Sequence, residues 1–243
     1  EGWTWSYEQK TNEKEGPGPH IDNVKKALEL PDDELLDALD AVIDLDQFMT
    51  FWALEVLVGH WDGYAGNTNN YYLYAHPDDQ RLRFLPWGAD ATFARAIDLA
   101  DENKEVPYGL LAHGFLARRL FLHPEGHAWY LSRLQWVLDE IWSEDEQHAQ
   151  VDRMEAIIAP LLFPEQIDGA FWKVGEVRTF IDKRRAEIED ELSQGGPTWE
   201  EPLRESFCWD YEAEVFLTFD SVFGSINDGN PYATSGSTTA FVP

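Results

Sequence analysis

Several things are scarce in this sequence, and each scarcity excludes a class of protein. Its 243 residues include one cysteine, Cys208, which excludes an internal disulfide framework and a cysteine-based zinc site. No run of about 18 apolar residues occurs, so we expect no membrane span. Basic residues are few, because 18 lysines and arginines stand against 46 aspartates and glutamates, for a formal net charge of −28. We therefore expect neither nucleic acid nor an anionic membrane as a partner.

The remaining composition is that of a globular protein, with 44% hydrophobic and 26% charged residues. The Gly- and Pro-containing stretch "SQGGPTW" at 193–199 indicates a boundary. We expect one domain over residues 1–198 and a short β-rich segment over 199–243, where "WDYEAEVFLTF" alternates like a strand. The expected fold class is α+β, mostly helical with a small β-hairpin.

Hydrophobic periodicity locates the elements of the first domain. The stretch "DLDQFMTFWALEVLVGH" is apolar on nearly every side, which predicts a central helix with Asp46 as a candidate N-cap and an end at Gly59. "NYYLYAHPDDQRLRFLPW" predicts two strands around a Pro-Asp-Asp turn. The other predicted helices are 21–30, 31–43, 108–123, 124–142, 144–162 and 175–192.

A polar loop, "GHWDGYAGNTNNYYLY" at 59–74, follows the central helix. Asp62 precedes Asn67 by five residues, which is the Asp-to-Asn spacing of a kinase catalytic loop. Phosphoryl transfer needs a carboxylate to hold the acceptor hydroxyl and an oxygen ligand nearby for a metal on the phosphates. Asp90 follows the predicted hairpin, where kinases carry a second metal-binding carboxylate. The spacing alone is a weak signal, and the order of helix, loop, strand pair and Asp makes it moderate.

Residues 44–93, "IDLDQFMTFWALEVLVGHWDGYAGNTNNYYLYAHPDDQRLRFLPWGADATF" with Ile43 in front, resemble the CotH family of spore-coat-type atypical protein kinases. The resemblance extends over roughly residues 5–192, through "LARRLFLHPEGHAWYLSRLQWVL" and "FIDKRRAEIEDEL". It implies a protein-kinase-like C-lobe. The N-lobe of a kinase carries a glycine-rich loop over the phosphates and a Lys–Glu pair. The sequence before the first predicted helices is too short for these features, so we expect the N-lobe to be largely absent.

The resemblance also implies roles for individual residues. Asp62 is the expected catalytic base, and Asn67 and Asp90 are the expected ligands of Mg²⁺ or Mn²⁺ on the phosphates of ATP. The positions expected to support the loop or the nucleotide are His60, Asn70 and Trp87, with Trp87 packing under the site. The implied activity is ATP-dependent phosphoryl transfer to Ser or Thr hydroxyls of a protein substrate.

One departure from the family pattern favours a different function. The family's Pro-Trp-Asp is Pro-Trp-Gly here, so Gly88 stands in place of a carboxylate. The alternative function is therefore that of a pseudokinase, a non-catalytic coat or surface interaction module. A third interpretation is an acidic, cation-binding extracellular module. The compartment stays unknown, and only the acidity and the resemblance suggest an extracellular or cell-surface location.

Ordinary structural roles compete with the catalytic ones. Asp62 can cap backbone amides, the Asn residues of the loop are common turn formers, and His60 can be a satisfied structural histidine. Asp90 can be the N-cap of a helix over "ATFARAI". The basic pair Arg184 and Arg185 is expected to form salt bridges on the surface.

Overall fold

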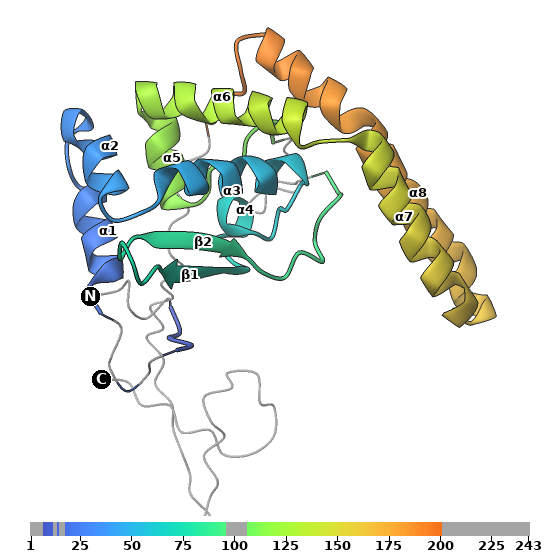
Figure 1. The fold of residues 1–243 in the computed structure, drawn as a ribbon. Helices are drawn as coiled ribbons and strands as arrows, with labels where there is room; N and C mark the ends of the chain where they lie inside the picture. The colour runs from blue at the N-terminus through green and yellow to red at the C-terminus, as the bar shows by residue number, and fades with distance from the viewer. Residues whose placement is uncertain (1–6, 12–13, 15–17, 96–105, 201–243) are drawn as a thin grey trace, which may run out of the picture. The chain divides into compact units, whose positions relative to one another are not determined.

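The computed structural model describes residues 7–11, 14, 18–95 and 106–200. Two compact units divide the chain, Glu1–Leu203 and Arg204–Pro243, and the second lies wholly outside the described residues. Cys208 and nearly all of the predicted β-rich segment 199–243 therefore also lie outside them. The described part is mainly helical with a two-stranded antiparallel sheet, which confirms the α+β class at that level (Figure 1).

The elements of the described part follow one another as short helices, a hairpin and longer helices. They are α1 His20–Leu28, α2 Asp32–Asp40, α3 Leu45–Leu57, α4 Tyr64–Asn67, β1 Tyr71–Ala75, β2 Leu82–Pro86, α5 Phe115–Leu122, α6 Pro124–Glu140, α7 Glu144–Ile158, the 3₁₀ turn η3 Ala159–Leu161, and α8 Pro164–Ser193. No helix in these ranges is long and apolar enough to cross a membrane.

Helix α3 lies in the centre of the core, as its all-round apolar sequence predicts. Phe48 and Trp52 are fully buried, and Trp52 stacks on Tyr130 of α6 with ring centroids 3.8 Å apart. The predicted N-cap is wrong by two residues. Asp44 caps the helix by accepting a hydrogen bond from the Gln47 amide at 3.3 Å, whereas Asp46 forms an ion pair with Arg133 of α6.

The predicted hairpin is confirmed, with Tyr72 opposite Leu85 in the antiparallel register. Its inner face packs on α3, where the rings of Phe48 and Phe84 lie 4.7 Å apart. The Gln47 side chain adds two hydrogen bonds to the Phe84 backbone, accepting from its amide at 3.0 Å and donating to its carbonyl at 2.7 Å. These contacts fix the hairpin, and with it both ends of the polar loop, against α3.

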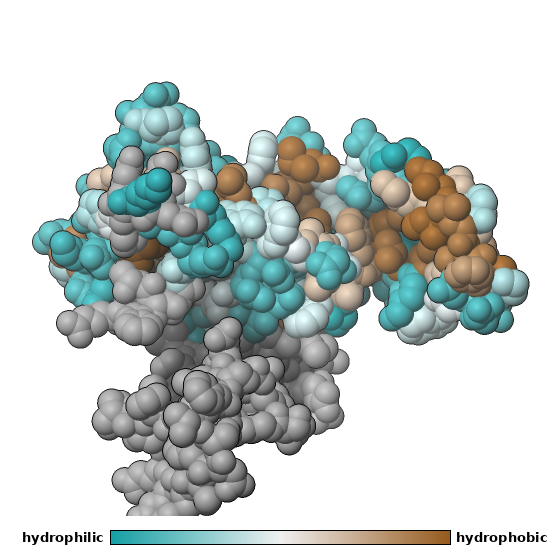
Figure 2. Space-filling model, turned by 90° about the horizontal axis from the view of Figure 1, so that it is seen from below, coloured by the Kyte–Doolittle hydropathy of each residue, from teal (hydrophilic) through white to brown (hydrophobic). Residues whose placement is uncertain are grey.

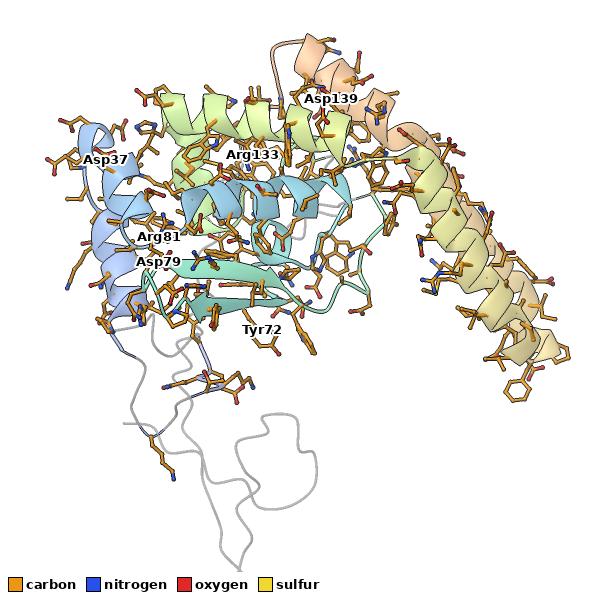
Figure 3. All side chains as sticks on the ribbon, viewed as in Figure 1. Asp37, Tyr72, Asp79, Arg81, Arg133 and Asp139 are labelled. Carbon is orange, nitrogen blue, oxygen red and sulfur yellow. The ribbon has the colours of Figure 1, made fainter. Side chains whose placement is uncertain are left out.

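Ion pairs hold the hairpin turn against the end of α2. Arg81 pairs with Asp79 of the turn at 3.3 Å and with Asp40 at 3.1 Å, and Arg83 pairs with Asp79 at 2.8 Å (Figure 3). The two arginines hold the pKa of Asp79 well below its usual range, through the hydrogen bond from Arg83 first. Because these groups are exposed, each pair contributes little to stability and mainly orients the turn.

The helix predicted over residues 108–123 forms only from Phe115 onward. The preceding segment is irregular and buried, and the Glu191 carboxylate accepts hydrogen bonds from the amides of Tyr108 at 2.6 Å and Gly109 at 2.7 Å. The His113 amide donates to the Ala65 carbonyl at 2.9 Å. A short apolar run is typical both of a helix and of buried irregular chain, so hydrophobic periodicity alone did not distinguish the two here.

Helices α7 and α8 form an antiparallel pair, and α8 begins at Pro164 rather than near the predicted residue 175. Only the second half of α8 enters the core, through Ile181, Arg184 and Ile188. Arg185 pairs with Glu144 at 2.8 Å, as predicted. Its neighbour Arg184 is 4% exposed, so the prediction of a surface salt bridge is wrong for that residue.

Candidate functional site

The polar loop between α3 and β1 holds the Asp62 carboxylate between two amides. The Asn67 side chain donates to Asp62 Oδ1 at 2.7 Å, and the Asn70 side chain donates to Asp62 Oδ2 at 2.7 Å. The structure therefore brings together three of the residues that the sequence predicted for the site. With one amide on each oxygen, the half-buried carboxylate is held in one orientation and keeps lone pairs for a further partner.

Asn70 also has the turn role that the sequence left open. Its φ is +50°, in the left-handed region that Asn tolerates better than most residues. This conformation turns the side chain back toward the loop, so that Nδ2 also lies 3.1 Å from the Asp62 carbonyl oxygen. The turn and the contact with Asp62 are thus one arrangement rather than competing explanations.

A buried carboxylate from α3 braces the loop from beneath. Glu55 is 3% exposed, and its two oxygens accept hydrogen bonds from the Tyr64 and Ala65 amides, both at 2.9 Å. A Cβ at Gly63 would lie 2.3 Å from Glu55 Oε1, so glycine is required where the chain passes this carboxylate. Glu55 is not among the site residues predicted from the sequence, although a single acid inside the apolar run "FWALEVL" is a usable signal.

His60 links this brace to the loop that follows the hairpin. Its Nδ1 lies 3.6 Å from Glu55 Oε1, and its Nε2 lies 3.3 Å from the Gly88 carbonyl oxygen. Burial by itself lowers the pKa of His60, but the hydrogen bond and charge of Glu55 outweigh it and raise the pKa above its ordinary value. His60 is a satisfied structural histidine whose contacts join two segments of the site.

Gly88 lies directly against the Asn70 side chain. Its φ is +57°, and a Cβ placed there would lie 2.7 Å from Asn70 Oδ1. The amide of Trp87 donates to the Asn70 carbonyl at 3.0 Å and keeps the two segments together. The backbone here is fitted to glycine, so a carboxylate side chain cannot be placed at residue 88 without displacing Asn70.

Asp90 and Trp87 are not drawn into the Asp62 cluster. Asp90 is exposed and has no hydrogen bond or ion pair within the described ranges, and no helix follows it up to residue 95, so the N-cap interpretation is wrong. The Trp87 side chain is 59% exposed and packs on Tyr72, with ring centroids 5.3 Å apart, rather than under the site. The segment beyond returns to α3, where the Phe93 amide donates to the Val58 carbonyl at 2.7 Å.

Arg184 of α8 fastens the end of α3 just before the polar loop begins. Its guanidinium donates to the carbonyls of Val56, of Leu57 at 2.9 Å and of Tyr108 at 2.8 Å. These carbonyls include terminal ones that a helix leaves without internal partners. Burial lowers the pKa of Arg184 to about 10, so the side chain stays cationic at neutral pH and complements the negative end of the helix dipole.

The donor set around Asp62 suits a hard divalent cation in chemistry. Carboxylate and amide oxygens, as on Asp62 and Asn67, are ligands that Mg²⁺ and Mn²⁺ accept, and Asp90 is a further carboxylate that lies outside this cluster. Among the described residues, however, no group of three or more His, Cys, Asp or Glu side chains lies close enough to hold a metal. A metal held here therefore depends on amide oxygens as well as on carboxylates.

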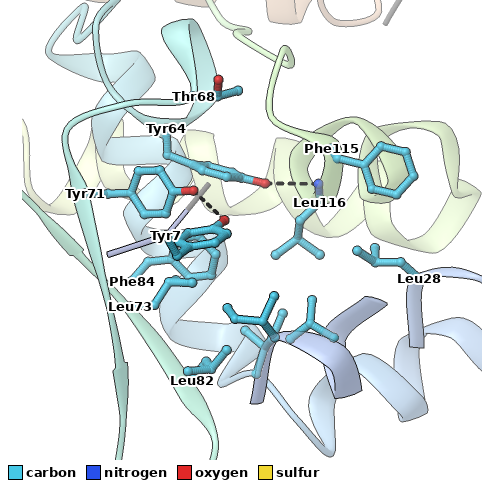
Figure 4. A pocket seen from close by; sticks show the side chains of 13 residues that line it. Tyr7, Leu28, Tyr64, Thr68, Tyr71, Leu73, Leu82, Phe84, Phe115 and Leu116 are labelled. Carbon is cyan, nitrogen blue, oxygen red and sulfur yellow. Dashed lines mark hydrogen bonds between the residues drawn. The ribbon is translucent and has the colours of Figure 1, made fainter. Parts of the chain in front are cut away.

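A separate apolar cavity of about 150 Å³ lies on the inner side of the hairpin, toward α1 and α5 (Figure 4). The Tyr7 and Tyr71 hydroxyls share a hydrogen bond of 2.7 Å at its wall, and Tyr64 Oη accepts from the Leu116 amide at 3.0 Å. Burial raises the pKa of these tyrosines, so their hydroxyls stay protonated. Asp62 and the two amides that hold it are not among the lining residues.

The described unit is thus a mainly helical protein with one hairpin, whose loop presents an amide-held aspartate. A family model described as "CotH kinase protein" matches residues 3–192, and the chain belongs to the CotH family. This confirms the resemblance on which the predicted site residues rest.

Similar proteins come from a fungus and a bacterium. "Invasin CotH7" and "Spore coat protein homolog 1" of Rhizopus delemar are each 27% identical over 139 residues, which is 55% of this chain and 23% of theirs. "Inner spore coat protein H" of Bacillus subtilis is 24% identical over 158 residues, which is 64% of this chain and 42% of that protein. The chain therefore spans less than half the length of these relatives.

Proposed function

We propose that this chain is the C-lobe of a kinase-like fold and takes part in ATP-dependent phosphoryl transfer to Ser or Thr hydroxyls of a protein. The observation that carries the proposal is the Asp62 carboxylate, half-buried and held by Asn67 and Asn70. Membership of a family whose model is described as "CotH kinase protein" supports it. The spore-coat and invasin names of the relatives support a cell-surface or extracellular location.

In this proposal the residues of the polar loop, together with Asp90 beyond the hairpin, have separate roles. Asp62 orients the acceptor hydroxyl and receives its proton, and the amides on both its oxygens keep the carboxylate from turning away. Asn67 and Asp90 supply oxygen ligands for Mg²⁺ or Mn²⁺. ATP supplies the phosphoryl group, and the bound cation offsets charge on its phosphates. Glu55 and His60 do not touch the reacting groups and hold the loop in place.

Phosphate transfer from labelled ATP tests the proposal. The longest natural form of the protein that contains these residues is incubated with Mg²⁺ or Mn²⁺ and a Ser-rich acceptor. We expect incorporation by the parent and a loss of about a hundredfold or more in Asp62→Asn, since a positioned general base contributes about 10² to 10⁴. Asp37→Asn on α2 is the matched control, because Asp37 is exposed and its side chain forms no hydrogen bond or ion pair within the described residues.

The second candidate is a non-catalytic interaction module, and the geometry of Gly88 favours it. The family carboxylate is missing at this position, and Asn70 leaves no room for a side chain there. This candidate predicts no incorporation with either cation in a folded parent. It also predicts that Asp62→Asn and Asp37→Asn behave alike, whereas a selective loss in Asp62→Asn excludes it.

A further inference from the structure

The turn from α7 into α8 carries a continuous group of exposed apolar side chains, which we term the helical tip. Figure 2 shows this brown surface at the end of the molecule where α7 and α8 lie. The exposed fractions range from 36% for Ile167 to 75% for Leu161. The members of the helical tip are Met154, Ile157, Ile158, Leu161, Phe163, Ile167, Phe171 and Trp172.

Nothing within the described residues covers the helical tip. Helix α7 has no buried residue, and the buried residues of α8 begin only at Ile181. A Cβ at Gly169 or at Gly175 would meet no atom within 4 Å, so α8 faces open space at these two positions. Single exposed apolar side chains are ordinary on a protein surface, whereas a contiguous group with a polar border marks an interaction site.

The border of the helical tip carries negative charge. Glu165, Asp168 and Glu176 are exposed and form no ion pair within the described ranges. Of the cations in these parts of α7 and α8, Lys173 lies over the Trp172 ring at 4.5 Å, and Arg153 donates to the Gln150 side chain at 3.0 Å on the α7 side. The border therefore offers carboxylates to whatever covers the apolar side chains.

Two other carboxylates near the tip are already satisfied. Arg178 pairs with Asp152 at 2.7 Å and with Glu155 at 2.8 Å. The free negative charge is thus concentrated at Glu165, Asp168 and Glu176, on the α8 side of the tip. A partner gains most by placing its cations along this one helix.

From this surface we infer that the helical tip binds a polypeptide segment with an apolar face bordered by Lys or Arg. Such a segment buries the exposed aromatic rings and pairs its cations with the free carboxylates of α8. An anionic membrane is disfavoured by the acidic border, and a second copy of the chain brings the same acidic border against its own. The inference is independent of phosphoryl transfer, because the site residues take no part in it.

Synthetic helical peptides test the inference on the full chain. The probe is an amphipathic peptide of Leu and Lys, long enough for about five turns, and its counterpart carries Glu in place of Lys. We expect the Leu–Lys peptide to bind and the Leu–Glu peptide to bind at least about tenfold more weakly. The double variant Ile158→Gln with Trp172→Gln is expected to weaken Leu–Lys binding at least about tenfold.

Matched controls separate this site from general attraction to an acidic protein. Leu122→Gln with Ile141→Gln removes two apolar side chains elsewhere, which are 61% and 49% exposed against 47% for Ile158 and 58% for Trp172. To test charge, the triple variant Glu165→Lys, Asp168→Lys, Glu176→Lys is compared with a triple variant that alters the net charge equally at exposed acids outside α7 and α8. That control set is Glu29→Lys, Asp37→Lys and Glu140→Lys.

Loss of Leu–Lys binding in both tip variants but in neither control supports the inference, provided that far-UV circular dichroism shows folded proteins. Equal effects of tip and control variants overturn it in favour of unspecific charge attraction. Tip-dependent sedimentation with phosphatidylcholine and phosphatidylglycerol vesicles overturns it in favour of a membrane. Dimerisation of the parent that the tip variants abolish, seen by analytical ultracentrifugation, overturns it in favour of a second copy.

Discussion

The sharpest structural prediction concerns Glu55, whose carboxylate organises the polar loop without being part of the predicted site. Glu55→Gln keeps one acceptor oxygen but places an NH₂ group against one of the two amides at 2.9 Å, those of Tyr64 and Ala65. One charge-assisted hydrogen bond is lost and the other becomes neutral. Hydrogen bonds to charged groups contribute about 1.5 to 3 kcal/mol each, so we expect a loss of roughly 2 to 4 kcal/mol in the free energy of unfolding.

Urea unfolding followed by tryptophan fluorescence measures this loss. In a chain of this size it corresponds to a fall in Tm of roughly 5 to 15 °C. Glu176→Gln is the control, because Glu176 is exposed in the middle of α8 and is expected to change stability by less than about 0.5 kcal/mol. If Glu55→Gln unfolds at the same urea concentration as Glu176→Gln, the carboxylate does not organise the loop and the reasoning fails.

Three further predictions follow from the surroundings of the loop. Arg184→Met removes the guanidinium from three carbonyls, of which that of Val56 keeps the Gly59 amide at 3.0 Å as a second donor, and should cost about 3 kcal/mol or more in urea unfolding. Arg185→Met alters a half-exposed side chain and should cost less than about 1 kcal/mol, and equal losses contradict the role of Arg184. Because the pKa of His60 is raised on folding, the contribution of His60 to stability is complete below about pH 6.5 and is lost as pH rises through the folded-state pKa. The free energy of unfolding, measured between about pH 6 and 9, should show this decline in the parent and not in His60→Gln, and a flat profile in the parent refutes the prediction. Gly88→Asp should destabilise the chain by about 1 to 3 kcal/mol, because the backbone at this position has a positive φ and the new side chain contacts Asn70. Adding Asn70→Gly should relieve the contact and raise the Tm of Gly88→Asp in thermal unfolding, whereas a Gly88→Asp variant as stable as the parent contradicts the predicted clash.

The sequence by itself determined the local elements and the order of the site. The apolar run of α3, the strand pair around its Pro-Asp-Asp turn and the Asp-to-Asn spacing of the polar loop are patterns of neighbouring residues. Each depends on periodicity or turn chemistry, which act over a few residues. For this reason Asp62, Asn67 and Asn70 could be selected together before their contacts were known.

The tertiary structure decided every feature that depends on a distant partner. From the sequence, Arg184 is predicted to be a surface cation, whereas in the structure it binds carbonyls at the end of α3. The segment before α5 is predicted to be helical, whereas in the structure Glu191 binds its amides in an irregular conformation. The effect of Gly88 depends on Asn70 reaching it from across the hairpin. Spacing along the chain carries little information on such contacts, because it does not record which buried donor meets which acceptor. Burial also depends on distant neighbours. The apolar residues of α7 have the spacing of an amphipathic helix, but no other described element packs over them closely enough to bury any of them.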